Sequence, residues 1–185
     1  DYETWNPYRR MFDVVWGGRR HVMMGATQVD RFGNQNIAGI GGTPDRPRTQ
    51  LLGFRGAPGN TIHNTTSYWV PAHSPKVFVE AVDIVTGVGY DRAAALPAAS
   101  TVHHEIRRVV SNLGVFDFET PDHRMRVRSL HPGVAADDVA AATGFELAGL
   151  DGEVAATRLP TADELRLLDE VIEALPTLLT FATTM

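Results

Sequence analysis

The 185-residue sequence contains no cysteine. Disulfide bonds, thiolate nucleophiles and cysteine-based zinc sites are therefore excluded, and a reducing, cytoplasmic setting fits this composition. Basic residues show no excess that would favour nucleic-acid binding, because 17 lysines and arginines against 22 aspartates and glutamates give a net charge of −5. No apolar run is long enough to cross a bilayer. What remains is the composition of an ordinary globular domain.

Hydrophobic residues make up 43% of the chain, and its length suffices for one domain with a sizeable core. No internal repeat and no linker argue for a second domain. The chain begins at Asp1 rather than at a methionine, and its first residues do not resemble a natural start. We therefore expect a single domain, residues 1–185, that lacks its natural N-terminal segment.

Apolar periodicity and turn-forming residues predict short strands mixed with helices. In the first part of the chain we expect a helix over 7–16, strands over 21–30 and 35–41, a loop over 44–48, and a helix passing into a strand over 60–70. In the second part we expect a buried strand over 76–87, a strand over 107–112, a hairpin of 115–119 with 124–130, and helices over 132–143 and 161–175. This order predicts an α/β fold with a twisted, mostly parallel sheet flanked by helices and an additional β-hairpin.

Two helix ends carry specific signals. Thr161 and Glu164 have the spacing of a capping box, which predicts the start of the last helix. Gly144 is a natural residue to end the preceding helix. The apolar tail, residues 176–185, is expected to dock on another surface or on a partner chain.

The stretch GFRGAPGNT, residues 53–61, raises the main functional question. It is no phosphate-binding P-loop, because the chain contains no Gly-Lys pair. It is no dinucleotide fingerprint either, because Arg55 stands where the second glycine is needed. A second glycine cluster, GIGGTPD, precedes prolines rather than a helix and is read as a loop.

Two interpretations of this glycine-rich loop remain, a surface turn and an anion-stabilising loop. The functional interpretation is favoured because hydrogen-bonding side chains share the stretch. These side chains are Arg55, Asn60, Thr61, His63, Asn64, Thr65, Thr66 and Ser67.

The order of motifs resembles the β subunits of class I CoA-transferases of the glutaconate and 3-oxoacid type. The motifs are GATQVDRFGNQN, the glycine loop, KVFVEAVDIVTG, VVSNLGVFDF, SLHPGV, TGFEL and LPTADELRLL. They cover the chain from about residue 19 to residue 168. Within this family, RGAPGNT, TSYWV and NLGVFDF are most similar to the β subunit of a branch of actinobacterial hydrolases that cleave a ring of a steroid-derived CoA thioester during cholesterol catabolism.

The resemblance implies an acyl-CoA substrate, a homologous α subunit as partner, and an α2β2 assembly. Coenzyme A would enter as part of the thioester substrate, and no separate cofactor or metal is implied. In glutaconate-type transferases the catalytic glutamate lies on the β chain, upstream of GATQVD. In the ring-cleaving hydrolases it is expected on the α subunit, so the main glutamate of this site is expected on the partner chain.

The resemblance also assigns roles within this chain. The loop residues Gly53, Arg55, Gly56, Gly59 and Asn60 would stabilise an oxyanion or bind substrate. Transferases tend to have Gly-x-Gly-Gly at the loop, and this sequence has Arg55 instead of a glycine. That departure favours a modified chemistry, in which the arginine pairs with a carboxylate or an enolate. A substrate pocket is expected from Thr65, Ser67, Tyr68 and Trp69, of which the two aromatic residues could equally belong to the core.

Other polar candidates are weaker. Glu80 and Asp83 would lie on opposite faces of a strand and are read as structural, and Glu105 lies in a charged, surface-like stretch. His103 and His104 are adjacent and cannot both face one metal from a strand. His63 and His73 remain as candidates for proton transfer. Asp30, Asn34 and Asn36 are expected to fix their own turn by local hydrogen bonds.

The leading hypothesis is a subunit of a hydrolase that opens a ring of a steroid-derived acyl-CoA by a retro-Claisen-like reaction. The alternative among enzymes is a true 3-oxoacid or glutaconate-type CoA-transferase. A third hypothesis is a non-catalytic scaffold subunit that orients the α chain, since no residue of this chain is a convincing base.

Overall fold

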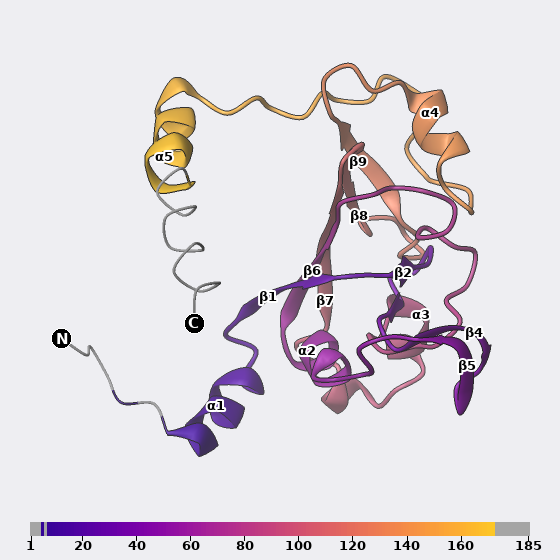
Figure 1. The fold of residues 1–185 in the computed structure, drawn as a ribbon, viewed down its shortest axis with the longest axis vertical. Helices are drawn as coiled ribbons and strands as arrows, with labels where there is room; N and C mark the ends of the chain where they lie inside the picture. The colour runs from indigo at the N-terminus through magenta and orange to yellow at the C-terminus, as the bar shows by residue number, and fades with distance from the viewer. Residues whose placement is uncertain (1–4, 6, 173–185) are drawn as a thin grey trace, which may run out of the picture.

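The computed structural model describes residue 5 and residues 7–172, and its centre is a five-stranded sheet of order β1-β6-β7-β8-β9 (Figure 1). β1 (His21–Gly25), β6 (Thr65–Val70) and β7 (Glu105–Ser111) run parallel to one another. β8 (Gly114–Asp117) and β9 (Arg126–Leu130) extend this sheet as antiparallel strands. The fold class predicted from the sequence, a parallel sheet with an additional hairpin, is confirmed.

The helices are short and lie around this sheet. They are α1 (Tyr8–Val15), α2 (Ala57–His63), α3 (Tyr90–Ala94), α4 (Ala136–Ala141) and α5 (Ala162–Ile172), with one turn of 3₁₀-helix at Ala98–Ser100. Figure 1 shows α1 and α2 at the same end of the molecule, where β1 begins. No helix among the described residues is long and apolar enough to cross a membrane.

The core lies between the sheet and the segments that cover it. Strands β6 and β7 are central, and one face of each contributes fully buried side chains because successive residues alternate between the two faces. The buried apolar cluster includes Val29, Tyr68, Val70, Phe78, Ile106, Val109, Phe116, Phe118, Met125, Val127, Leu130, Val139, Phe145 and Leu147.

The segment 76–87 differs from its prediction as a buried strand. Its apolar side chains are buried, and Phe78 is 0% exposed, but the backbone forms only isolated bridges, such as the one between Phe78 and Val29. Val29 N–H donates to the Val77 carbonyl at 2.8 Å, and the Val29 carbonyl accepts from Val79 N–H at 3.0 Å. The strand prediction is wrong because apolar character reports burial, whereas a strand also requires a continuous partner for its backbone.

Residues 39–50 differ in the opposite way. The predicted loop contains a two-stranded antiparallel hairpin of β4 (Gly39–Thr43) and β5 (Arg46–Gln50). Pro47 is compatible with this pairing because both strands of a two-stranded ribbon are edge strands. On an edge strand the N–H group that proline lacks can be one that would point to solvent. A second small pair, β2 (Gln28–Val29) with β3 (Gln35–Asn36), flanks the predicted turn at residues 30–34.

The two helix-end predictions have different outcomes. The capping box at α5 is confirmed, because Thr161 N–H donates to Glu164 Oε2 at 2.8 Å and Glu164 N–H donates to Thr161 Oγ1 at 3.2 Å. The role of Gly144 as a helix stop is wrong, since α4 already ends at Ala141. Gly144 instead allows close approach to residue 78, because a Cβ there would lie 2.6 Å from the Phe78 carbonyl oxygen. The apolar tail, 176–185, lies outside the described residues.

Candidate functional site

An open cleft lies at the carboxyl ends of the parallel strands β1 and β6. Gly25 and Trp69 are paired in register at those ends, and both line the cleft. In open α/β sheets, ligands bind at this edge. The cleft has a volume of about 560 Å³ and is lined by Met24, Gly25, Ala26, Thr27, Gln35, Ile37, Leu52, Arg55, Gly56, Ala57, Asn60, Trp69 and Pro71.

The glycine loop supplies one wall of the cleft. Arg55, Gly56 and Asn60 line it, as the sequence predicts for a substrate loop, whereas Gly53 and Gly59 do not. Gly53 has a φ of +86°, a conformation natural to glycine, and shapes the turn that precedes α2. Gly59 faces the other side of α2, where a Cβ would lie 4.0 Å from Trp16 Nε1.

Arg55 adopts an unusual backbone conformation. Its φ is +48°, and His123 is the only other non-glycine residue among those described with a positive φ. Such a conformation costs a side-chain-bearing residue on the order of 1 kcal/mol and clusters at functional sites. The guanidinium is exposed at the cleft and forms no hydrogen bond or ion pair within residues 7–172. An unpaired cation on a strained loop is suited to binding an anion.

The N–H groups of the loop are only partly free to bind a ligand. Ala57 N–H donates to the Phe54 carbonyl at 3.1 Å, and Asn60 N–H donates to the Gly56 carbonyl at 2.9 Å. Pro58 has no N–H to offer. The N–H groups of residues 57 and 60 are therefore occupied, and a ligand can be met only by the start of α2, beside Arg55.

The predicted pocket residues on β6 divide between the cleft and the interior. Trp69 lines the cleft and is 56% exposed, whereas Tyr68 is 0% exposed and donates its hydroxyl proton to the Gly33 carbonyl at 3.1 Å. Burial raises the pKa of the Tyr68 phenol well above its usual value. Thr65 donates to Glu105 Oε2 at 2.8 Å and Ser67 lies 2.8 Å from His21 Nε2, so neither lines the cleft. Of the four, only Trp69 is placed to contact a ligand there.

The proton-transfer candidates lie elsewhere. His73 is buried, stacks on Phe78 at 3.5 Å between ring centres, and contacts Ser111 Oγ and Thr143 Oγ1 at 2.9 Å each. Burial lowers its pKa to about 4. A neutral histidine with both nitrogens engaged is a core residue. His63 stacks on Trp16, with ring centres 5.6 Å apart, on the side of α2 away from the cleft.

The turn at Asp30 is held by its own side chains, as predicted. Asp30 accepts hydrogen bonds from the N–H groups of Phe32 and Asn34 at 3.0 Å each, and Asn34 Nδ2 also donates to Asp91 at 2.8 Å. Burial raises the pKa of Asp30 despite these hydrogen bonds. Asn36 Nδ2 donates to Gln28 and to the Gly39 carbonyl at 2.7 Å each. These contacts hold β2, β3 and the turn between them in place, and the polar groups that make them are not directed at a ligand.

The remaining carboxylate candidates also have structural partners. Glu80 forms an ion pair with Arg31, and Asp83 accepts hydrogen bonds from Gln28 Nε2 and Gly41 N–H. Glu105 pairs with Arg107 at 2.9 Å on the outer surface of β7. No aspartate or glutamate lines the cleft among the described residues.

Among the lining residues that the sequence did not predict, two form specific hydrogen bonds through their side chains. Gln35 is fully buried at the base of the cleft, where Nε2 donates to the Gly25 carbonyl at 2.5 Å. Met24 accepts a hydrogen bond from Asn60 Nδ2 on its sulfur at 3.5 Å. The glutamine had a signal in the sequence, because a polar residue within an apolar strand requires a buried partner.

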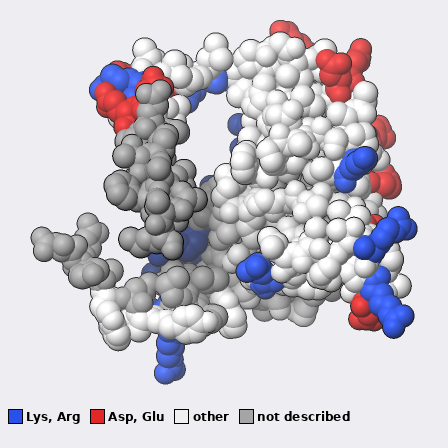
Figure 2. Space-filling view, viewed as in Figure 1, with Lys and Arg blue, Asp and Glu red and all other residues white. Residues whose placement is uncertain are grey.

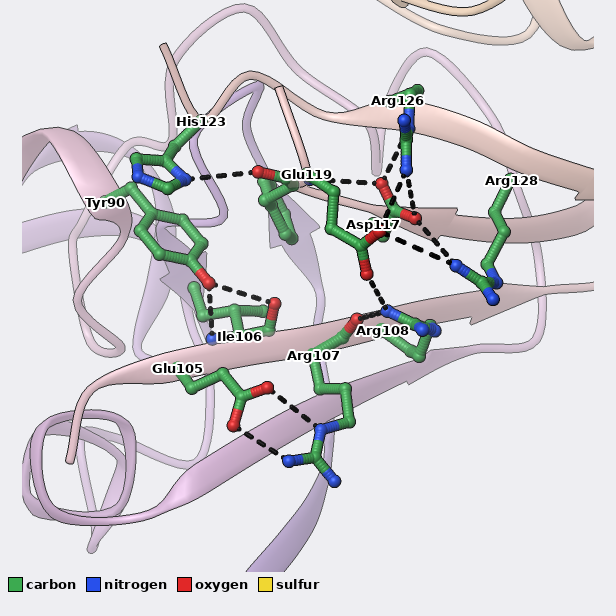
Figure 3. A network of polar contacts seen from close by, with 11 residues as sticks. Tyr90, Glu105, Ile106, Arg107, Arg108, Asp117, Glu119, His123, Arg126 and Arg128 are labelled. Carbon is green, nitrogen blue, oxygen red and sulfur yellow. Dashed lines mark hydrogen bonds and ion pairs between the residues drawn. The ribbon is translucent and has the colours of Figure 1, made fainter. Parts of the chain in front are cut away.

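A separate network of arginines and carboxylates covers the outer part of the sheet (Figure 3). Asp117, whose side chain is 0% exposed, pairs with Arg126 at 2.9 Å and with Arg128 at 3.4 Å. Burial alone would raise the pKa of Asp117, but the hydrogen bonds from Arg126, Glu119 N–H and Arg128 outweigh it and hold the pKa below its usual value. This network ties β8 to β9 and lies away from the cleft.

The chain is similar in sequence to subunits of two kinds of enzyme, the ring-cleaving hydrolases and the CoA-transferases. The chain is 56% identical over 171 residues to the cholesterol ring-cleaving hydrolase IpdB subunit of Rhodococcus jostii RHA1, covering 92% of this chain and 66% of the relative. The IpdB subunit from Mycobacterium tuberculosis H37Rv is 56% identical over 172 residues, covering 92% and 67%. One subunit of the 3-oxoadipate CoA-transferase from Pseudomonas knackmussii is 31% identical over 82% of this chain and 58% of its own length. No protein-family model matches the chain.

Solved structures agree as well. The crystal structure of Rhodococcus jostii RHA1 IpdAB matches with a TM-score of 0.83 and 55% identity, over 91% of this chain and 66% of that one. Glutaconate CoA-transferase from Acidaminococcus fermentans matches in fold with a TM-score of 0.70 and 24% identity, over 81% and 57%. The fold is therefore that of the CoA-transferase structures.

Within that class, the chain belongs to the family of IpdB subunits of cholesterol ring-cleaving hydrolases. It spans about two thirds of the length of these relatives.

Proposed function

We propose that this chain is the β subunit of a hydrolase that opens a ring of a steroid-derived acyl-CoA in the cytoplasm. The observation that carries the proposal is the cleft at the ends of β1 and β6. It combines the unpaired Arg55 with apolar walls from Ile37, Leu52 and Trp69, and no described carboxylate lines it. Apolar walls suit a polycyclic acyl group, and a cation suits the charge that develops during its cleavage.

The proposed reaction adds one water across a carbon–carbon bond. A glutamate of the partner α subunit removes a proton from water, and the oxygen attacks the carbonyl carbon of a ring ketone. The tetrahedral intermediate collapses to a carboxylic acid, which ionises by releasing its proton to solvent. As the ring bond breaks, its electron pair stays on the neighbouring carbon as an enolate. The same glutamate returns the proton to that carbon. Arg55 and the adjacent N–H groups stabilise the oxyanion and the enolate.

The assembly is part of the proposal. The chain would pair with a homologous α subunit in an α2β2 heterotetramer, and the absence of a cleft carboxylate among the described residues supports a base that comes from the partner. Coenzyme A would be carried by the substrate. The IpdAB relative supports this arrangement, because its name denotes two kinds of subunit.

A true CoA-transferase is the second candidate, and the 31% identity to a 3-oxoadipate CoA-transferase subunit supports it. The two chemistries differ in one intermediate. A transferase forms a glutamyl-CoA thioester, which hydroxylamine or borohydride traps, whereas direct hydrolysis of a ring bond forms none.

The test is turnover by the complex of this chain with its α subunit. With a steroid-derived ring acyl-CoA in ¹⁸O-labelled water, we expect one ¹⁸O in the new carboxylate and no trapped glutamyl-CoA. Trapping of the enzyme thioester, together with transfer of CoA to an added carboxylic acid, would replace the hydrolase with the transferase.

A further inference from the structure

A second concave surface lies beside α1, and half of the described residues that line it are arginines. Four arginines converge on it from two parts of the chain, Arg9 and Arg10 from α1 and Arg19 and Arg20 from the segment before β1. The reversal between them uses Gly18, whose φ is +68°. The hollow has a volume of about 930 Å³, and among the described residues Asp13 is the only acidic one in its lining. We refer to these four residues as the arginine cluster.

The arginine cluster is not neutralised by ion pairs with the part of the chain that the structure describes. None of the four arginines forms an ion pair with any residue between 7 and 172. Four positive charges with one aspartate concentrate positive charge in a protein whose net charge is −5. Figure 2 shows basic side chains in the region of α1 and others at the right of the view, and acidic side chains at the upper right and at α5. Mutual repulsion in such a cluster is relieved when an anion binds.

The position of the cluster relates it to the cleft. Trp16, which follows α1, stacks on His63 of α2 and lies close to Gly59. The next residue, Asn60, lines the cleft. The end of α1 and the helix α2, which forms one wall of the cleft, therefore lie side by side. In a CoA thioester the long, flexible pantetheine arm joins the acyl group to the phosphates, so one substrate molecule can contact both concave surfaces.

We propose that the arginine cluster binds the phosphate groups of the CoA portion of the substrate, namely the 3′-phosphate and the diphosphate. Arginine is suited to this role because its planar guanidinium donates two parallel hydrogen bonds to a phosphate. The inference rests on the proposed function, in which the substrate is an acyl-CoA. It adds a second contact region, which holds the end of the substrate that does not react.

The test measures binding to the complex of this chain with its α subunit. The probes are CoA, pantetheine, which lacks all phosphates, and inorganic phosphate. The variants are Arg9→Gln/Arg10→Gln and Arg19→Gln/Arg20→Gln. The matched control is Arg46→Gln/Arg48→Gln, because these two arginines lie on the exposed hairpin strand β5 and are likewise without ion pairs among the described residues.

Each cluster variant is expected to bind CoA about tenfold or more weakly, since charged hydrogen bonds are lost. Pantetheine binding and the control should be unchanged. Unchanged CoA affinity in both cluster variants overturns the proposal, as does an equal loss for pantetheine. Equal affinity for inorganic phosphate and CoA would replace it with a general phosphate site, and dissociation of the subunits by the variants would assign the cluster to an acidic surface of the partner.

The outcome separates this inference from the proposed function. Ring opening with an unchanged KM in both cluster variants contradicts the phosphate site alone. Binding of CoA that depends on the cluster, in a complex that opens no ring, contradicts the hydrolase alone.

Discussion

The outer face of β7 to β9 and the surface around α1 and the cleft use arginine in two different ways. On the strands, Arg107, Arg108, Arg126 and Arg128 all pair with carboxylates of the same sheet (Figure 3). At the cleft and in the arginine cluster, five arginines have no such partner among the described residues. Paired arginines stabilise the fold, whereas unpaired ones gathered on concave surfaces are available to a ligand.

The largest expected effect on stability is at Asp117. The change Asp117→Asn removes a buried negative charge and leaves Arg126 and Arg128 with the exposed Glu119 as their remaining described partner. We expect a loss of roughly 2–4 kcal/mol in the free energy of unfolding, less than for a fully buried pair because both arginines reach solvent. Chemical denaturation measures it. The matched change Glu119→Gln, at an exposed carboxylate of the same network, should cost much less, and equal losses would show that burial does not set the hierarchy.

The next effect concerns activity rather than stability. Arg55→Ala should lower kcat/KM of the assembled enzyme by about 100-fold, the loss typical of one group that stabilises an oxyanion. The melting temperature should be unchanged, because the side chain contacts no described partner. Arg46→Ala serves as the control. Full activity and substrate affinity in an intact Arg55→Ala assembly would favour a scaffold role for this chain and remove the cleft assignment.

A smaller effect, on the pH dependence of stability, is expected from His73. This histidine is buried without an acidic partner among the described residues and stays neutral. Its pKa is lowered to about 4, so between pH 6.5 and 4 the unfolded chain binds a proton that the folded chain does not. Stability should fall as the pH decreases through this range, by at most about 1.4 kcal/mol per pH unit. Denaturation midpoints at several pH values test this.

The variant His73→Gln isolates that contribution. It should flatten the pH dependence, whereas His63→Gln should not. A residual slope is expected from His104, whose pKa is also lowered by burial. An identical slope in the wild type and in His73→Gln would remove His73 as its source.

The smallest effect is expected at Arg107. Its pair with Glu105 is open to solvent, and such pairs are screened and entropically costly. Arg107→Ala should leave the denaturation midpoint within experimental error, and its KM for the acyl-CoA should equal that of the wild type. A raised KM would mean that paired arginines also contact the substrate.

Local signals in the sequence predicted much of this fold. The capping box at Thr161, the turn at Asp30 and the hairpin of β8 and β9 depend on residues close in sequence, and each is found. The segment 76–87 shows the limit, because its apolar residues are buried from an irregular backbone. The apolar pattern of a segment predicts whether its side chains are buried. It does not predict which strand, if any, its backbone pairs with.

The site was predictable to a similar degree. Arg55 and Asn60 share one short loop and were found together. Met24 reaches the cleft because β1 pairs with β6 across more than 40 residues, and Gln35 of β3 reaches it through its hydrogen bond to Gly25. No local pattern in the sequence records either contact. The alternation of side chains along a strand does predict one feature of the site. Tyr68 and Trp69 are neighbours on β6, so only one of them can face the cleft.

The left-handed backbone at Arg55 has an evolutionary consequence. Glycine adopts a φ of +48° without steric cost, so a glycine at position 55 would fit the same loop conformation as the arginine. A single codon change to glycine would relax about 1 kcal/mol of strain and delete the charge, without rebuilding the wall of the cleft. The same loop backbone can therefore carry either residue, and an exchange of the two would change the charge of the cleft while the course of the main chain stays the same.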